Sequence, residues 1–540
     1  MEYIKSLSAD VTEINIECKN LSILPNLLRF TCLQKLDCSR NQLIQLDNLP
    51  SSLQVLNCSH NKITQLNNLP SSLQKLYCSH NKLMRLCNLP VSLQELDCSS
   101  NQISQLEQII SIRENNLFYS LQILDCSYNQ IIQLDNLPYS LQKLYCKTNK
   151  LTQLDNLPPL LQELQCSDNQ LTQLDNLPIS LKRLDCSDNQ LIQLDNLPGS
   201  LQELKCSFNQ LTQLDNLPSS LQILYCSKNL LVILNNLPFF IKTLDCSYNQ
   251  IIQLDKLPSS LQILECSHNQ LTILDNLPLS LQKLYCTFNR LIRSDNLPSS
   301  LQELNFYDNQ LMQLDNLPLS LQKLDCTHNQ LIQLNNLPLS LQNLYCSHNQ
   351  LTQLDNLPHF LQELYCYNNQ LTQIDNLPSS LQKLDCSFNQ LTQLDNLPLS
   401  LQVLICPFNK LTQLDKLPSS LQELECSNNQ IIQLDNLPFS LKTLYCWNNQ
   451  LLHLDNLPLS IQLLKCSDNK MINNDSEYWK EIIKNKKLKL LKEKFNARKI
   501  QKIWRKYWYD FYKYELIDGE YIGFCRFIEK SYSIINGSSI

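Results

Sequence analysis

A repeat of 20 residues is the sequence feature that most constrains how this chain can fold. Cysteines recur at this spacing in two runs, over residues 38–98 and 126–466, with Phe306 in place of one cysteine. These runs hold 21 of the 25 cysteines of the 540-residue chain. An asparagine follows three residues after each position of this column, so the sequence contains 22 repeats. A periodic unit of this length predicts a solenoid, in which each repeat packs only against its neighbours.

The typical unit, over residues 381–400, predicts the layout of one coil. Leu384 and Cys386 have the parity of a β-strand, so both are expected to point into the solenoid, whereas Asp385 points out. The asparagine of the unit is expected to bond backbone groups of neighbouring coils, because leaving such buried groups unpaired would cost about 1–3 kcal/mol each. The proline of each Asn-Leu-Pro favours an extended return segment rather than a helix.

Over residues 33–470 the units match the pattern Leu-x-x-Leu-x-Leu-x-x-Asn-x-Leu, with cysteine at the third leucine. The chain thereby resembles leucine-rich-repeat proteins. That resemblance implies a curved, single-domain leucine-rich-repeat solenoid with a parallel β-sheet on its concave face and extended or turn segments on its convex face. The Leu-Pro-x-Ser-Leu signature is similar to the repeats of bacterial effector proteins. The recurring Cys-Ser-x-Asn-Gln-Leu and Asp-Asn-Leu-Pro resemble more closely the leucine-rich-repeat proteins of mimivirus-type giant viruses, and the first half of the unit also resembles repeats of social amoebae.

Three regions follow from the repeat boundaries. Residues 1–32 keep the apolar spacing of a repeat but lack its cysteine and asparagine, which is typical of a degenerate capping repeat. Residues 33–470 hold the repeats, and an eight-residue insertion near 107–115 predicts a loop on one face, either a plain bulge or a contact for a partner. Residues 471–540 form a tail whose apolar spacing predicts a C-terminal α-helical appendage, with Asp475 as its N-cap.

Nothing in the sequence indicates an enzyme, a cofactor or a metal site. Only four glycines are present, too few for phosphate-binding loops, and no Cys-x-x-Cys pair provides zinc-ligand spacing. The inward cysteines are interpreted as small buried apolar residues, and reduced thiols predict an intracellular, reducing compartment. Cys525, the only cysteine beyond the repeats, is a weak candidate nucleophile. His60 with His80, and His328 with His348, occupy equal places in adjacent repeats and could lie close together, but two ligands do not make a metal site.

The outward position between the second leucine and the cysteine predicts a binding surface, because outward side chains of the concave sheet are free of packing. Aspartate and tyrosine fill it at Asp37, Tyr77, Asp97, Asp125, Tyr145, Asp185, Tyr225, Asp245, Tyr285, Asp325, Tyr345, Tyr365, Asp385 and Tyr445. Glu265 and Glu425 add to the acids, against Lys205 and Lys465. Tyrosine offers a large, rigid contact area with a polar tip. This acidic and aromatic stripe predicts a basic protein partner, unless duplication of the repeats simply copied a solvated alternation.

The tail differs in charge from the repeats before it. Residues 471–540 hold 15 Lys and Arg against nine Asp and Glu, whereas residues 1–470 hold 29 against 41. Part of the tail resembles the opening of an IQ motif, a helix that calmodulin-type proteins bind. The matching residues are Ile500, Gln501, Trp504 and Arg505. The match is partial, since Lys506 replaces a glycine and Asp510 a basic residue. The tail is therefore expected to cap the last repeat, to bind a calmodulin-like protein, or to bind an anionic membrane or nucleic acid, with nucleic acid the least expected.

These observations predict a non-enzymatic protein–protein interaction or scaffold protein that uses the concave face of the solenoid. The alternative is a host-directed effector whose basic tail helix recruits a calmodulin-type protein or an anionic membrane. A membrane span is not expected, because no run approaches about 18 apolar residues. The first residues also lack the pattern of a secretory signal.

Overall fold

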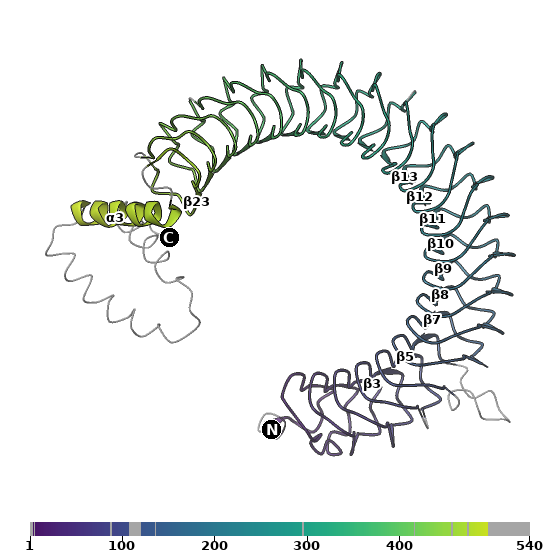
Figure 1. The fold of residues 1–540 in the computed structure, drawn as a ribbon. Coiled ribbons are helices and arrows are strands. Elements are labelled where there is room, and N and C mark those ends of the chain that lie inside the picture. Colours follow the sequence, from purple (N-terminus) through teal and green to yellow (C-terminus); the bar gives the residue numbers. More distant parts are fainter. Residues whose placement is uncertain are drawn as a thin grey trace. The chain divides into compact units, whose positions relative to one another are not determined.

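The computed structural model describes most of the repeat region and the start of the tail. The described residues are 4, 6–86, 89–106, 120–135, 137–293, 296–414, 416–454, 457–471 and 475–494. Their contacts divide the chain into two compact units, Met1–Leu371 and Thr372–Ile540. Each unit is a stack of coils with one short strand per coil (Figure 1), which confirms the predicted leucine-rich-repeat solenoid.

Every strand is three residues long and is centred on an inward leucine or, in β1, isoleucine. The first unit holds β1 Glu13–Asn15, β2 Lys35–Asp37, β3 Val55–Asn57, β4 Lys75–Tyr77, β5 Glu95–Asp97, β6 Ile123–Asp125, β7 Lys143–Tyr145, β8 Glu163–Gln165, β9 Arg183–Asp185, β10 Glu203–Lys205, β11 Ile223–Tyr225, β12 Thr243–Asp245, β13 Ile263–Glu265, β14 Lys283–Tyr285, β15 Glu303–Asn305, β16 Lys323–Asp325, β17 Asn343–Tyr345 and β18 Glu363–Tyr365. The second unit holds β19 Lys383–Asp385, β20 Val403–Ile405, β21 Glu423–Glu425, β22 Thr443–Tyr445 and β23 Leu463–Lys465.

Within each unit, consecutive strands pair in parallel with a register of one repeat. Leu204 of β10 lies opposite Leu224 of β11, for example. The additional residues between β5 and β6 leave this register unchanged, because Leu96 lies opposite Leu124. Side chains that are 20 residues apart in the sequence therefore become neighbours on the strand face, at the usual interstrand spacing of about 4.8 Å.

The interior consists of the leucine and cysteine columns. In the typical coil, Leu381, Leu384 and Cys386 are at most 1% exposed. Phe306 is equally buried in the one repeat that lacks the cysteine. Full burial of one leucine side chain stabilises the fold by about 1.5–3 kcal/mol. The prediction that the second strand leucine and the column cysteine both point inward is confirmed.

The asparagine column joins neighbouring coils through buried hydrogen bonds, as the sequence predicts. The Nδ2 group of Asn61 donates to the carbonyl oxygens of Cys38 and Cys58, both at 3.1 Å. Its Oδ1 atom accepts from the backbone N–H of Leu43 at 2.9 Å. The same pattern recurs in later coils, for example at Asn249, which is bonded to the Cys226 carbonyl oxygen. The asparagine column thus pairs buried backbone groups of neighbouring coils, and a typical column carbonyl oxygen accepts from two asparagines, as Cys58 does from Asn61 and Asn81.

Two turns in each coil pass through the left-handed backbone region. The first turn lies at the residue just before the asparagine column, where φ is between 51° and 56° in all 22 coils; we call these residues the rim column. The second turn lies on the return segment two residues before the proline, at an asparagine or, in two coils, a lysine. At the 17 described positions φ is between 53° and 58°, and we call these residues the return column. A turn also precedes each strand, as where the Leu201 N–H donates to the Pro198 carbonyl oxygen at 3.0 Å. These turns explain how the chain coils with few glycines, and the described return segments between residues 33 and 471 contain no helix.

The tail begins with helix α3, Ser476–Lys494, which lies against β23 of the same unit (Figure 1). The carboxylate of Asp475 accepts from the backbone N–H of Glu477 at 2.9 Å, so the predicted N-cap is confirmed. Trp479 and Ile483, four residues apart on one face of the helix, are buried. None of the helices in the described ranges is both long and apolar enough to cross a lipid bilayer.

Candidate protein-binding surface

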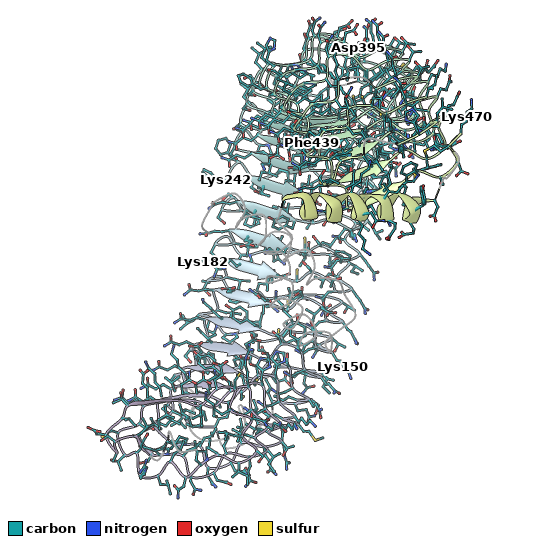
Figure 2. The ribbon with its side chains drawn as sticks, turned by 90° about the vertical axis from the view of Figure 1, so that its left-hand side faces the viewer. Lys150, Lys182, Lys242, Asp395, Phe439 and Lys470 are labelled. Atoms are coloured by element: carbon teal, nitrogen blue, oxygen red, sulfur yellow. The ribbon has the colours of Figure 1, made fainter. Side chains whose placement is uncertain are left out.

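Within each unit the predicted stripe forms a row on the strand face, and we call these residues the strand row. Each of its aspartates and tyrosines is the last residue of a strand and is half-buried between the same position of the neighbouring strands. The register places Tyr345 beside Tyr365, and their rings stack with centroids 5.0 Å apart. Figure 2 shows the strands of the first unit side by side, with Lys182 and Lys242 at the edge where the strands begin. The rim column lies at the opposite edge, where the strands end.

All seven aspartates of the strand row close the turn that follows their strand. One carboxylate oxygen of each accepts from the backbone N–H two residues later, at 2.9 to 3.3 Å. Asn57 and Asn305 make the same bond in their coils. This structural role was not predicted, although an aspartate or asparagine two residues before a serine or threonine is a recognisable turn signal. Burial raises the pKa of the Asp125, Asp325 and Asp385 carboxyls.

Several tyrosines of the strand row are bonded to a glutamate on the next strand. The Tyr77 hydroxyl donates to Glu95 at 3.0 Å, and the Tyr285 hydroxyl donates to Glu303 at 2.6 Å. Lysines complete these groups, with Lys75 2.8 Å from the Glu95 carboxylate. Tyr345 is held in the same way by the next glutamate. The recurrence of Lys-Leu-Tyr followed by Glu-Leu in the next repeat is the sequence signal for this arrangement.

These bonds reveal a second row, at the first residue of each strand, that sequence reasoning left out. In the repeats it holds seven Lys or Arg and six Glu, so the strand face as a whole is less acidic than the strand row alone. Most of its bases are paired, such as Lys75 with Glu95 at 2.8 Å and Lys283 with Glu303 at 2.6 Å. The strand face therefore carries both acidic and basic side chains. Its net negative charge comes from the acids that have no paired base among the described residues.

Asp245 and Glu265 are the clearest of those acids. They lie opposite each other on β12 and β13, and no described Lys, Arg or His makes an ion pair with either. Burial, and then repulsion by Asp245, raises the pKa of the Glu265 carboxyl. Two adjacent carboxylates that are half-buried without a cation would be stabilised by an incoming positive charge.

A ladder of rings lies beside the strand row at its rim. The contacts run without a break from one coil to the next over nine coils, through Phe208, Lys228, Tyr248, His268, Phe288, Tyr307, His328, His348 and Tyr367. We call this set the rim ladder. His328 and His348 stack with centroids 3.9 Å apart, and His60 and His80 stack at 4.1 Å outside the ladder, so both expected histidine contacts are confirmed. Tyr307 and Tyr367 enter the ladder from the position before the rim column, which the sequence spacing did not indicate.

The column cysteines are buried thiols rather than reactive groups. Burial, assisted by the Asp37 carboxylate, raises the pKa of Cys38 to about 12. Burial, and then the neighbouring Cys78 and Cys38 thiols, raises the pKa of the next column thiol, Cys58, well above its ordinary value. Within the described residues every cysteine is free, and no cluster of ligands could hold a metal ion. Protonated thiols in the core contribute packing and no nucleophile.

The predicted tail site is not placed by the structure. Ile500, Gln501, Trp504 and Arg505 lie outside the described residues, as do Cys525 and the insertion near 107–115. The described start of the tail, helix α3, has its apolar side chains Trp479 and Ile483 buried.

Comparison with known families and structures identifies the repeats. Family models described as "Leucine Rich repeats (2 copies)" match residues 339–379 and 359–399, and "Leucine Rich Repeat" matches residues 52–76. A model described as "FNIP Repeat" matches residues 268–309. No curated protein matches the chain.

Solved structures extend this likeness over most of the chain. YopM from Yersinia enterocolitica is 34% identical with a TM-score of 0.67, over 80% of this chain and 90% of that one. YopM from Yersinia pestis, a leucine-rich effector protein, is 32% identical with a TM-score of 0.52, over 56% and 86%. CroV588, a circular leucine-rich-repeat protein, is 28% identical with a TM-score of 0.55, over 84% and 75%. The coils, their buried columns and these likenesses agree: the chain belongs to the leucine-rich-repeat family.

Proposed function

We propose that this protein is a non-enzymatic scaffold whose strand face binds a basic segment of a partner protein. The observation that carries the proposal is the pair Asp245 and Glu265, two half-buried carboxylates side by side without an ion pair among the described residues. Tyr225 and Tyr285 flank the pair on the adjacent strands and add rigid contact area. Proteins of this fold are typically interaction modules, which supports the same reading.

Removal of both negative charges tests the proposal directly. The double variant Asp245→Asn and Glu265→Gln removes both charges while keeping the side-chain shapes. A fluorescent 12-residue peptide of alternating arginine and serine is the probe. Its Kd for the variant is expected to rise about thirtyfold, since two lost charge contacts at about 1 kcal/mol each weaken binding by about 2 kcal/mol. The matched control is Asp215→Asn with Asp275→Asn, which removes two exposed charges from return segments in the same region. Equal affinity of the strand-face variant and the control would refute the proposal.

A host-directed effector is the second candidate. It is supported by the likeness to YopM, one example of which is itself described as a leucine-rich effector protein. Its tail would recruit a calmodulin-type protein or an anionic membrane. The test is a peptide of residues 475–514 titrated with calmodulin in the presence and absence of calcium, and with anionic vesicles; binding to neither would remove this candidate.

The setting of the protein also belongs to the proposal. Buried free thiols throughout the core are compatible with a reducing, intracellular compartment, where such thiols persist. The relationship to giant-virus proteins stays a prediction from the repeat sequence. Recovery of the protein from host cytoplasm after expression in amoebae would support the compartment, and its secretion would contradict it.

A further inference from the structure

The rim ladder holds bulky side chains in a backbone conformation that suits them poorly. Phe208, Tyr248 and Phe288 have φ of 56°, 53° and 52°, in the left-handed region where a side chain crowds the following carbonyl. Asparagine tolerates this region better, and the same column has asparagine at Asn368 and Asn428. Rings at these positions therefore give up local stability, which indicates that they are kept for their surface.

The ladder is also unusually exposed for a run of aromatic residues. Phe208, Tyr248 and Phe288 remain 44%, 47% and 41% exposed, although their ring faces touch the neighbouring rungs. Nine coils at about 4.8 Å give a ridge of about 38 Å, which matches about 12 residues of extended chain at about 3.3 Å per residue. The ridge is long enough for a peptide segment and too continuous to be a set of isolated surface residues.

Charges beside the ladder indicate what would cover it. Asp245 and Glu265 lie three residues before Tyr248 and His268, in the same coils, and have no ion pair among the described residues. Within the ladder, the Lys228 ammonium lies 4.1 Å from the Phe208 ring centroid and 5.2 Å from that of Tyr248. The ladder thus already accommodates a cation between two rings. The two carboxylates favour a positively charged occupant over an acidic one, and the Lys228 contacts show that the ring faces can hold a cation.

We propose that the rim ladder, with the adjacent carboxylates Asp245 and Glu265, is the docking ridge for an extended basic segment of a partner protein in which basic and aromatic or aliphatic side chains alternate. Successive side chains of an extended segment point to opposite sides. One set would lie on the rings, and the other would reach the carboxylates. This inference rests on the proposed function. It adds contacts between the rings of the ladder and the apolar side chains of the partner segment.

The test separates the ladder from the charges. The variant combines Phe208→Asn, Tyr248→Asn, His268→Asn and Phe288→Asn, using the residue that the column itself contains elsewhere. The probes are two fluorescent 12-residue peptides, one alternating arginine with tryptophan and one alternating arginine with serine. The unaltered protein is expected to bind the tryptophan peptide at least tenfold more tightly. The ladder variant should lose this preference and keep its affinity for the serine peptide, with no fall in melting temperature.

A control variant replaces the same number of side chains at another part of the surface. It combines Ile132→Asn, Ile192→Asn, Ile252→Asn and Ile292→Asn, all exposed on return segments. It should retain the preference for tryptophan. A preference that survives in the ladder variant, or that is absent from the unaltered protein, would overturn the inference and leave the proposed function standing. Undiminished binding of the serine peptide by the Asp245→Asn and Glu265→Gln variant would instead overturn the proposed function.

Discussion

The rim column and the return column adopt nearly the same left-handed backbone, yet the sequence fills them very differently. Of the 17 return positions described with positive φ, 15 are asparagine and two are lysine. Of the 22 rim positions, three are asparagine, and the others include four phenylalanines, five histidines and two tyrosines. Since the backbone requirement is the same, it cannot be the reason for the difference.

The contrast separates two kinds of selection on a repeat. In the return column the main requirement on the side chain is that it permits the turn. The residue that best tolerates positive φ therefore occupies most of these positions. In the rim column the side chains touch one another along the strand face, and their surface outweighs the local conformational penalty. The departure from the conformational optimum at one edge, while the other edge keeps it, is the observation on which the proposed docking ridge rests.

The largest expected effect comes from the asparagine column that follows the rim turn. Replacing Asn249 by alanine removes the amide group that donates to the Cys226 carbonyl oxygen. It also removes the oxygen that accepts from the Leu231 N–H. The buried Leu231 N–H then loses its acceptor, whereas the Cys226 carbonyl oxygen keeps its bond from Asn229. The unpaired N–H and the lost amide bonds together should lower the unfolding free energy by about 3 kcal/mol. Urea denaturation followed by circular dichroism measures the loss. Gln250→Ala, an exposed change next in the chain, serves as the control and should have almost no effect.

The next largest effect tests the return column. Asn216, at φ 55°, is expected to tolerate glycine with little change. Asn216→Val should lower the unfolding free energy by about 1–2 kcal/mol, because a β-branched side chain is strained in the left-handed region. Thermal melts of the two variants measure the difference. Equal stability of the valine and glycine variants would show that positive φ does not select asparagine in this column.

A smaller effect is expected at the equivalent turn of the rim. Phe208→Asn relieves about 1 kcal/mol of backbone strain and loses ring contacts of about the same size, so its stability should stay within about 1 kcal/mol of the unaltered protein. The same thermal melts measure it. A loss of 2 kcal/mol or more would mean that the rim ladder is a structural element, and the proposed contrast between the two columns would fail.

The sequence was sufficient for the parts of the fold that depend only on period and parity. A 20-residue repeat with apolar residues at strand spacing leaves one arrangement that buries Leu384 and Cys386 together, and the asparagine column had to pair the backbone groups that this arrangement buries. Both expectations are confirmed. The short strands follow from the same logic, since in most coils a turn at the proline precedes the strand and a residue with left-handed φ lies three positions after its end.

The details of the surface could not be predicted in the same way. The turn bond of Asp37 depends on how the backbone leaves the strand, which parity does not describe. The pairing of Tyr77 with Glu95 needs the register between coils and the direction of both side chains. Tyr307 joins the rim ladder from the neighbouring position because Asp308 cannot stack, which becomes visible only when the ring positions are known.

The smallest expected effect separates charge from turn formation in the strand row. Asp325→Asn keeps the turn, because Asn305 in the equivalent position accepts the same backbone N–H at 2.9 Å. Burial raises the pKa of the Asp325 carboxyl in the folded protein, so folding binds a proton and the charged form weakens the fold at neutral pH. The asparagine variant should therefore be more stable at pH 7, by less than about 0.5 kcal/mol. This advantage should disappear as the pH falls below the ordinary aspartate range, where the carboxyl is protonated in both states.

Asp185→Asn is the matched control, because it removes an ion pair with Lys147 at 3.2 Å and should destabilise the protein slightly. Urea midpoints at pH 7 and pH 3 measure both variants, and equal responses would show that the carboxylates of the strand row share one environment, with no unpaired subset available to a basic partner.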